Sequence, residues 1–137
     1  MKNYFQKWYE NLDIPASAKD LFDESVDCFR IDAFRSSYLM AFIGMHYIIR
    51  NNILSTTNNP DNISQKKWSE ICSRLKDEDS YDCEIRNIIR MKDDSRLLNI
   101  NESFRKEYIT LREYRNNCAH GKKPLLVFEF MNVYIVF

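Results

Sequence analysis

The sequence predicts an all-α fold, and three observations lead to that prediction. Only two glycines and three prolines occur, where average usage would give roughly ten and seven, so turn-dense all-β architectures are disfavoured. Apolar residues recur at helical spacing along most of the chain. At 137 residues, the chain is long enough to bury a core of its own but too short for two independent ones. We therefore expect a single helical domain over residues 1–137.

Two helices are predicted in the first half of the chain. The first covers residues 16–29, with Asp13 or a neighbour as its cap and Pro15 tolerated in its first turn, where a missing N–H costs nothing. The second covers 31–54 and should be central, because it is apolar nearly all round. Gly44 within it costs about 1 kcal/mol relative to alanine, which a close approach by a neighbouring helix would explain. One apolar stripe of this helix contains Ile31, Phe34, Tyr38, Ala41, Met45 and Ile48.

Three further helices are predicted after a polar loop over residues 55–62, where turn-forming residues concentrate. Ser64 opens the first of them, and Asn101 is a credible cap for the last. Gly121 stands just beyond the end of the last helix, where glycine is the residue that helix ends prefer. The three helices are expected over residues 64–76, 81–91 and 102–120.

The C-terminal segment 124–137 allows two interpretations. Its β-branched and aromatic residues favour a strand, whereas a helical fold would add one more helix there. Both remain open, with the helix preferred.

Charge and cysteine usage narrow the class of protein. Twenty basic and twenty acidic residues cancel, which removes any argument for a polycationic nucleic-acid coat. The longest apolar run, 37–49, falls well short of the ~20 residues that a membrane span needs, so no membrane association is expected. The cysteines form no C-x-x-C motif and follow no signal peptide, so we expect free thiols in a reducing cytoplasm. They are Cys28, Cys72, Cys83 and Cys118.

The last predicted helix carries polar residues where its pattern asks for apolar ones. Phe104, Tyr108, Leu111, Arg115 and Cys118 follow a 4-3-4-3 spacing, so Arg115 occupies an apolar slot. A buried guanidinium is costly unless it is paired or faces a ligand. An adjacent stripe holds Arg112, Asn116 and His120, in which Asn116 lies one turn from His120 and is placed to orient the imidazole. Lys122 and Lys123 add positive charge that a phosphate backbone would favour.

The run Arg115-Asn116-Asn117-Cys118-Ala119-His120 resembles the motif of HEPN domains, in which arginine, a polar residue and a spacer precede histidine. This all-α family includes many bacterial toxin, antiviral-defence and CRISPR-associated ribonucleases. The motif covers six residues, but its place on a late helix, after a long apolar second helix, extends the resemblance in architecture. The resemblance implies an up-and-down bundle of four to five helices that dimerises so that two motifs form one composite cleft.

The resemblance also implies a metal-independent endoribonuclease without cofactors, acting as a toxin or defence effector, with a cognate antitoxin or other protein as a further partner. His120 would activate the ribose 2′-hydroxyl or protonate the leaving 5′-oxygen, Arg115 would stabilise charge on the phosphate, and Asn116 would position His120 or the RNA. We expect Arg112, Lys122 and Lys123 to bind RNA. One departure concerns Lys122, which stands where the toxin subgroup inactivated by nucleotidylation carries tyrosine, so regulation by that route is not expected.

Structural alternatives compete with these assignments. Arg115 in a buried ion pair and His120 capping the final carbonyls would be ordinary features of a helix. His46 is expected to be a core histidine, and the aromatic cluster around Trp8 to pack rather than to stack on bases. Cysteine and histidine spacing argues against zinc, and neither a glycine-rich phosphate loop nor a G-x-S-x-G motif occurs.

A non-catalytic HEPN-like module that dimerises or binds RNA or nucleotide is the alternative function, and a helical adaptor without an RNA role is a third.

Overall fold

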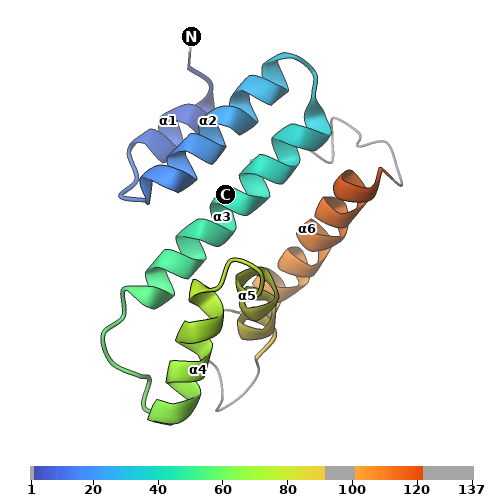
Figure 1. Cartoon of the computed structure of the whole chain (residues 1–137). Helices are drawn as coiled ribbons and strands as arrows, with labels where there is room; N and C mark the ends of the chain where they lie inside the picture. The colour runs from blue at the N-terminus through green and yellow to red at the C-terminus, as the bar shows by residue number, and fades with distance from the viewer. Residues whose placement is uncertain (1, 92–100, 122–137) are drawn as a thin grey trace. The chain divides into compact units, whose positions relative to one another are not determined.

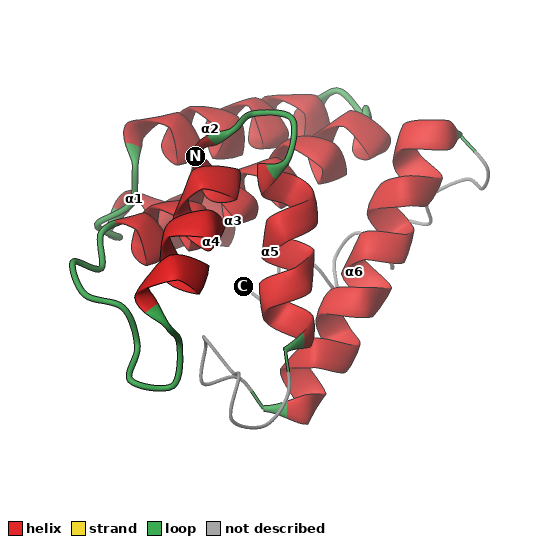
Figure 2. Cartoon of the chain, turned by 60° about the horizontal axis from the view of Figure 1, so that its bottom comes forward, coloured by secondary structure: helices red, strands yellow, loops and turns green. Residues whose placement is uncertain are grey.

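The computed structural model describes residues 2–91 and 101–121, and all regular structure in these ranges is α-helical (Figures 1 and 2). The all-α prediction is therefore confirmed for the described residues. The segment 124–137, for which a helix and a strand were both considered, lies outside them. The described residues form six helices, one more than the upper number that the resemblance implies. The helices are α1 (Tyr4–Glu10), α2 (Ala16–Arg30), α3 (Phe34–Leu54), α4 (Gln65–Lys76), α5 (Tyr81–Arg90) and α6 (Glu102–His120).

The boundaries of α4 and α6 agree with the prediction because local capping residues define them. The Ser64 side chain accepts a hydrogen bond from the Lys67 backbone N–H at 3.3 Å, which caps α4. Asn101 caps α6 in the same way, accepting from the Phe104 N–H at 2.8 Å. Gly121 follows α6 with φ of 62°, a left-handed conformation that glycine adopts without steric cost.

The junction of α2 and α3 departs from the prediction. The helix expected from residue 31 begins at Phe34, because Asp32 adopts φ of 61° and interrupts the helical backbone. Ile31 is consequently 75% exposed and does not belong to the buried stripe of α3. The cap proposed for α2 is also wrong, since Pro15 rather than Asp13 occupies the cap position and no side chain supplies a capping bond.

Helix α1 was not predicted, although its cap is visible in the sequence. Asn3 and Gln6 form a reciprocal capping box, in which each side chain accepts from the backbone N–H of the other residue. Phe5, Trp8 and Tyr9 then pack against Phe22 of α2, with ring centroids 5.3 to 6.4 Å apart. The expectation that this aromatic cluster packs on the protein is confirmed for these three residues, whereas Tyr4 is 83% exposed.

The described chain divides into two compact units. Unit 1 contains residues up to Ile48 and those from Tyr108 onward, and therefore includes α1, α2, most of α3 and the C-terminal two thirds of α6. Unit 2 runs from Ile49 to Glu107 and includes α4, α5, the end of α3 and the start of α6. The motif residues Arg115 and His120 both belong to unit 1.

In unit 1, α2 and α3 approach each other closely at Gly44, as the sequence predicted. A β-carbon at Gly44 would lie 2.6 Å from Cε1 of the fully buried Phe22, closer than carbon atoms can approach. Two buried hydroxyls bind the same helices together, with the Ser25 Oγ donating to the Ser37 carbonyl at 2.7 Å and the Ser37 Oγ donating to the Ser25 carbonyl at 2.6 Å. Small residues at this contact therefore allow the two backbones to pack tightly.

We expect Gly44→Ala to lower the free energy of unfolding. Displacing the Phe22 ring costs about 1–3 kcal/mol, because this ring is held among Phe5 and Tyr9, and the gain of about 1 kcal/mol in helix propensity offsets only part of that cost. Denaturant unfolding would measure the difference. Asn51→Ala, at an exposed position of the same helix, is the control and should be neutral or slightly stabilising. Equal stabilisation by both substitutions would contradict the tight contact.

In unit 2, α4 packs on α5, and an ion pair between the exposed Arg74 and the buried Glu84 joins them. Glu84 is 4% exposed and accepts from the Arg74 Nε at 2.7 Å and from its Nη2 at 3.4 Å. The hydrogen bonds that Arg74 donates to this carboxylate raise the pKa of Arg74. Most apolar positions predicted for the two helices are buried, and Cys72 is half-buried. The buried residues are Trp68, Ile71, Leu75, Ile85, Ile88 and Ile89.

Arg105, at the start of α6, closes the end of α5. This side chain is 5% exposed, and its Nε donates to the Ile89 carbonyl at 3.0 Å while its Nη2 donates to the Met91 carbonyl. The last carbonyls of a helix have no partners within the helix, so a buried guanidinium that binds them replaces the missing donors. Its Nη1 also contacts the exposed Glu102 carboxylate at 3.3 Å.

Candidate functional site

The candidate site lies on the last turns of α6. Of the predicted inward face of this helix, Tyr108, Leu111 and Cys118 are buried, whereas Phe104 is half-buried. Arg115 stands on the same face and is half-buried, whereas His120, the last residue of the helix, is exposed. The imidazole is therefore accessible from solvent, and the base of the arginine side chain is packed against the protein.

The guanidinium of Arg115 is not held by a carboxylate among residues 2–91 and 101–121. Its Nη1 donates to the Asn116 Oδ1 at 3.0 Å, and its Nε is buried without a hydrogen-bond partner among the described residues. A buried N–H without a partner costs about 1–3 kcal/mol, and a ligand that accepts from it would recover that energy. The ordinary alternative for Arg115, an internal ion pair with aspartate or glutamate, does not form within the described part of the chain.

Asn116 has a different partner from the one expected. The spacing predicted that it would orient His120, but no hydrogen bond joins these two side chains, and its Oδ1 accepts from Arg115 instead. On a helix, neighbouring residues do not normally face each other, so this bond requires the arginine side chain to turn outward toward the exposed Asn116. Asn116 consequently sets the direction of the guanidinium rather than that of the imidazole.

Of the three residues expected to bind RNA, one is described by the structure and two are not. Arg112 is half-buried, and its Nη1 approaches the Tyr108 hydroxyl at 3.4 Å, so part of this guanidinium faces the protein. Lys122 and Lys123 lie outside the described residues. Of these three residues, only Arg112 belongs to the described part of the chain. It lies next to the Tyr108 hydroxyl, which is also hydrogen-bonded to His46 of α3.

His46 is confirmed as a core residue. It is 1% exposed, its Nε2 lies 3.0 Å from the Tyr108 hydroxyl, and its ring packs 4.5 Å from that of Phe42. Cys118 is likewise buried, as expected for a small packing residue, and all four cysteines are free thiols. Neither His46 nor Cys118 is accessible to a substrate.

Tyr38 is a site-forming residue that sequence reasoning did not identify. Its hydroxyl donates to the Leu111 carbonyl at 2.7 Å, which joins α3 to α6 across 73 positions of the sequence. Its ring also meets that of Tyr114, edge to face, at 6.4 Å. Because Leu111 and Tyr114 lie within the helical turn before Arg115, Tyr38 fixes the part of α6 from which Arg115 and His120 project. Burial raises the pKa of Tyr38 well above its usual value of 10.0.

This raised pKa gives a pH dependence of stability. Above pH 10 the unfolded chain loses the Tyr38 proton while the folded chain keeps it, so the free energy of unfolding falls by about 1.4 kcal/mol for each further pH unit. Tyr38→Phe should cost about 1 kcal/mol at neutral pH, because the Leu111 carbonyl loses its donor, but its stability should fall less steeply above pH 10. Denaturant unfolding at several pH values measures both effects.

Tyr4→Phe, at an exposed position, is the matched control and should follow the wild-type pH curve. Parallel alkaline curves for wild type and Tyr38→Phe would show that the buried hydroxyl is not the source of the effect.

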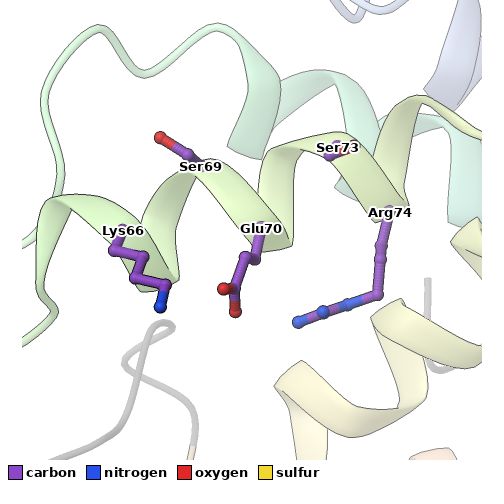
Figure 3. Close-up of a pocket in the computed structure, with 5 residues that line it drawn as sticks. All are labelled: Lys66, Ser69, Glu70, Ser73 and Arg74. Atoms are coloured by element: carbon purple, nitrogen blue, oxygen red, sulfur yellow. The ribbon is translucent and has the colours of Figure 1, made fainter.

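A separate pocket lies in unit 2. It has a volume of about 550 Å³ and is lined by polar and charged residues of α4 (Figure 3). Arg74 at its edge is already bound to Glu84, and Glu70 places a carboxylate beside the Lys66 ammonium within the same lining. This mixture of charges favours no ligand class, and the motif residues do not contribute to it. The lining residues are Lys66, Ser69, Glu70, Ser73 and Arg74.

Membrane spans and metal-binding clusters are both absent from the described residues. No helix among residues 2–91 and 101–121 is both long and apolar enough to cross a membrane. Within the same ranges, no three His, Cys, Asp or Glu side chains are grouped so that they would hold a metal ion.

Comparison of the chain with protein families, with curated proteins and with solved structures finds no match. The function must accordingly be inferred from the motif and from the geometry around it.

Proposed function

We propose that this protein is a HEPN-type endoribonuclease that cleaves RNA without a metal ion, with Arg115 and His120 as its catalytic residues. This proposal rests on the exposure of His120 and on the contacts of Arg115, the two motif residues on α6. His120 is exposed, and Arg115 directs its guanidinium toward the exposed Asn116 without forming an ion pair with any described carboxylate. A guanidinium taken out of water is costly unless it is paired or faces a ligand, so the lack of a described carboxylate partner for Arg115 supports a ligand-binding role.

The proposed chemistry uses the nucleophile that RNA already contains. The ribose 2′-oxygen attacks the adjacent phosphorus, the bond to the 5′-oxygen breaks, and the products carry a 2′,3′-cyclic phosphate and a 5′-hydroxyl. His120 takes the proton from the 2′-hydroxyl or gives one to the leaving 5′-oxygen, the two roles that a positioned imidazole can have in general acid–base catalysis. Arg115 donates hydrogen bonds to the phosphate oxygens as negative charge builds on them. Asn116 is a positioning residue for Arg115.

A composite site from two copies of the chain is part of the proposal. Arg115 and His120 are five positions apart on one helix, which separates them by about 140° around the axis and about 7.5 Å along it. Two copies that meet at the ends of α6 would surround one phosphodiester with both residue types. We further propose that the protein acts as a bacterial toxin or antiviral-defence effector, restrained by a cognate antitoxin or another protein.

The test is incubation of the purified protein with single-stranded RNA in excess chelator, with binding and cleavage measured on the same substrate. Cleavage that leaves cyclic-phosphate ends supports the enzyme. Binding without cleavage would support the alternative, a non-catalytic HEPN-like module, and the absence of both would support a helical adaptor. Light scattering in the presence of RNA tests the composite site, which a strictly monomeric protein would contradict.

A further inference from the structure

Helix α6 carries a second row of side chains beside the motif, formed by Tyr114, Asn117 and His120. Each member stands three positions after the one before, so neighbours in the row are about 60° apart around the helix axis and about 4.5 Å apart along it. Residues at this spacing are neighbours on the surface of a helix. Tyr114 and Asn117 are half-buried and His120 is exposed, so part of each side chain is accessible from solvent.

Asn117 carries a side-chain amide that the fold does not use. The adjacent amide of Asn116 accepts a hydrogen bond from Arg115, whereas no side-chain hydrogen bond holds Asn117 among residues 2–91 and 101–121. An asparagine amide presents an N–H donor next to a carbonyl acceptor. The Asn117 amide is therefore suited to a ligand that offers an acceptor next to a donor.

Tyr114 precedes Asn117 by one turn, and its ring is held in place. This ring meets that of the buried Tyr38 edge to face, with the centroids 6.4 Å apart and the planes at 80°. The contact leaves the ring partly exposed, and the Tyr114 hydroxyl has no hydrogen-bond partner in the described part of the chain. Aromatic side chains bind unpaired RNA bases by stacking, which every base tolerates. The row thus combines a ring that can stack on a base with an amide that can distinguish one base from another.

We propose that Tyr114 and Asn117 form a subsite for the nucleobase next to the scissile phosphodiester, and that Asn117 selects adenine. This inference rests on the proposed function, which places that phosphodiester beside His120. Adenine offers its 6-amino donor next to a ring-nitrogen acceptor on both the Watson–Crick and the Hoogsteen edge, so an amide can pair with either edge. Of these two edges, the other three bases offer an adjacent donor and acceptor on the Watson–Crick edge alone.

The competing roles of both residues are structural. Packing against Tyr38 alone would account for Tyr114, and a place on the polar surface of α6 would account for Asn117. The two kinds of role differ in what a substitution changes. Loss of packing lowers the free energy of unfolding, whereas loss of a base contact changes which RNA is bound.

The test measures binding of short single-stranded RNAs by the His120→Ala protein, so that cleavage does not interfere. The probes are three oligouridines with one central purine, which is adenosine, guanosine or purine riboside, a nucleoside without the 6-amino group. The adenosine strand should bind about five- to tenfold more tightly than the other two, the lower end of the discrimination that a bidentate amide–base pair gives. Adding Asn117→Ala should abolish this difference, whereas Asn87→Ala, at an exposed position of α5, is the matched control and should keep it.

A second variant tests the stacking surface. Adding Tyr114→Ala should weaken the binding of all three strands by at least about fivefold, because stacking does not depend on the identity of the base. Tyr114→Phe keeps the ring and should bind all three strands as its parent does. Should Tyr114→Ala fail to fold, Tyr114→Leu, which keeps an apolar side chain without an aromatic face, must show the same loss.

An adenosine strand that binds no better than the other two, or a preference that survives Asn117→Ala, would overturn the inference. Cleavage of RNA by the wild-type protein together with either of these results would refute the base subsite alone. A preference that depends on Asn117, in a protein whose wild-type form does not cleave RNA, would refute the nuclease proposal alone. No binding of any strand by any variant would refute both.

Discussion

Replacing His120 by alanine is expected to lower the rate of RNA cleavage by about 10²- to 10⁴-fold, because the proton transfer at the reacting oxygens then has no positioned group. Arg115→Ala should lower it by about 10²- to 10³-fold, the usual cost of removing one donor that stabilises a developing oxyanion. The double variant should lose much less activity than the product of the two single losses. Removing either residue already disables the step that both residues serve. Single-turnover cleavage of a labelled RNA measures all three rates.

Arg90→Ala is the control for these variants. Arg90 is an exposed arginine at the end of α5, in unit 2, so its removal changes the net charge as Arg115→Ala does without touching the motif. It should cleave RNA at the wild-type rate. Circular dichroism must show that all variants keep their helices. A folded His120→Ala protein with wild-type activity would exclude His120 from the chemistry.

Replacing Arg105 by alanine should lower the free energy of unfolding by about 3–5 kcal/mol, the largest stability change that the structure predicts. The substitution removes two charge-assisted hydrogen bonds, each worth about 1.5–3 kcal/mol, and leaves the Ile89 and Met91 carbonyls at the end of α5 without these donors. The side chain is 5% exposed, so water replaces these bonds poorly.

Glu102→Ala separates the carbonyl bonds from the ion pair of Arg105. The Glu102 side chain is 59% exposed, and an exposed ion pair contributes at most about 1 kcal/mol, so this variant should remain close to wild type. Denaturant unfolding followed by circular dichroism compares the two substitutions. Similar small losses for both would show that Arg105 does not hold the end of α5.

The helices were predictable where local chemistry defines them. Ser64, Asn101 and Gly121 are capping residues whose preferences depend on a few neighbours, and the boundaries of α4 and α6 follow from them. The start of α3 was missed because the left-handed conformation of Asp32 depends on how the chain turns between two packed helices. Helix α1 was missed although the Asn3 and Gln6 box that caps it is a local signal.

The candidate site was predictable only along one helix. The spacing of Arg115 and His120 and their place at the end of α6 follow from sequence periodicity. The hydrogen bond between Asn116 and Arg115 does not follow from periodicity, because it depends on the side-chain rotamer that Arg115 adopts. The hydrogen bond from Tyr38 to Leu111 connects positions far apart in the chain, so no local pattern indicates it.

The most direct test of the nuclease proposal is cleavage of an RNA in which the ribose at a mapped cut position carries hydrogen instead of its 2′-hydroxyl. If the 2′-oxygen is the nucleophile beside His120 and Arg115, this one bond should resist cleavage while other sites are cut as before and yield cyclic-phosphate ends. Cleavage of the modified bond at the wild-type rate would contradict the account.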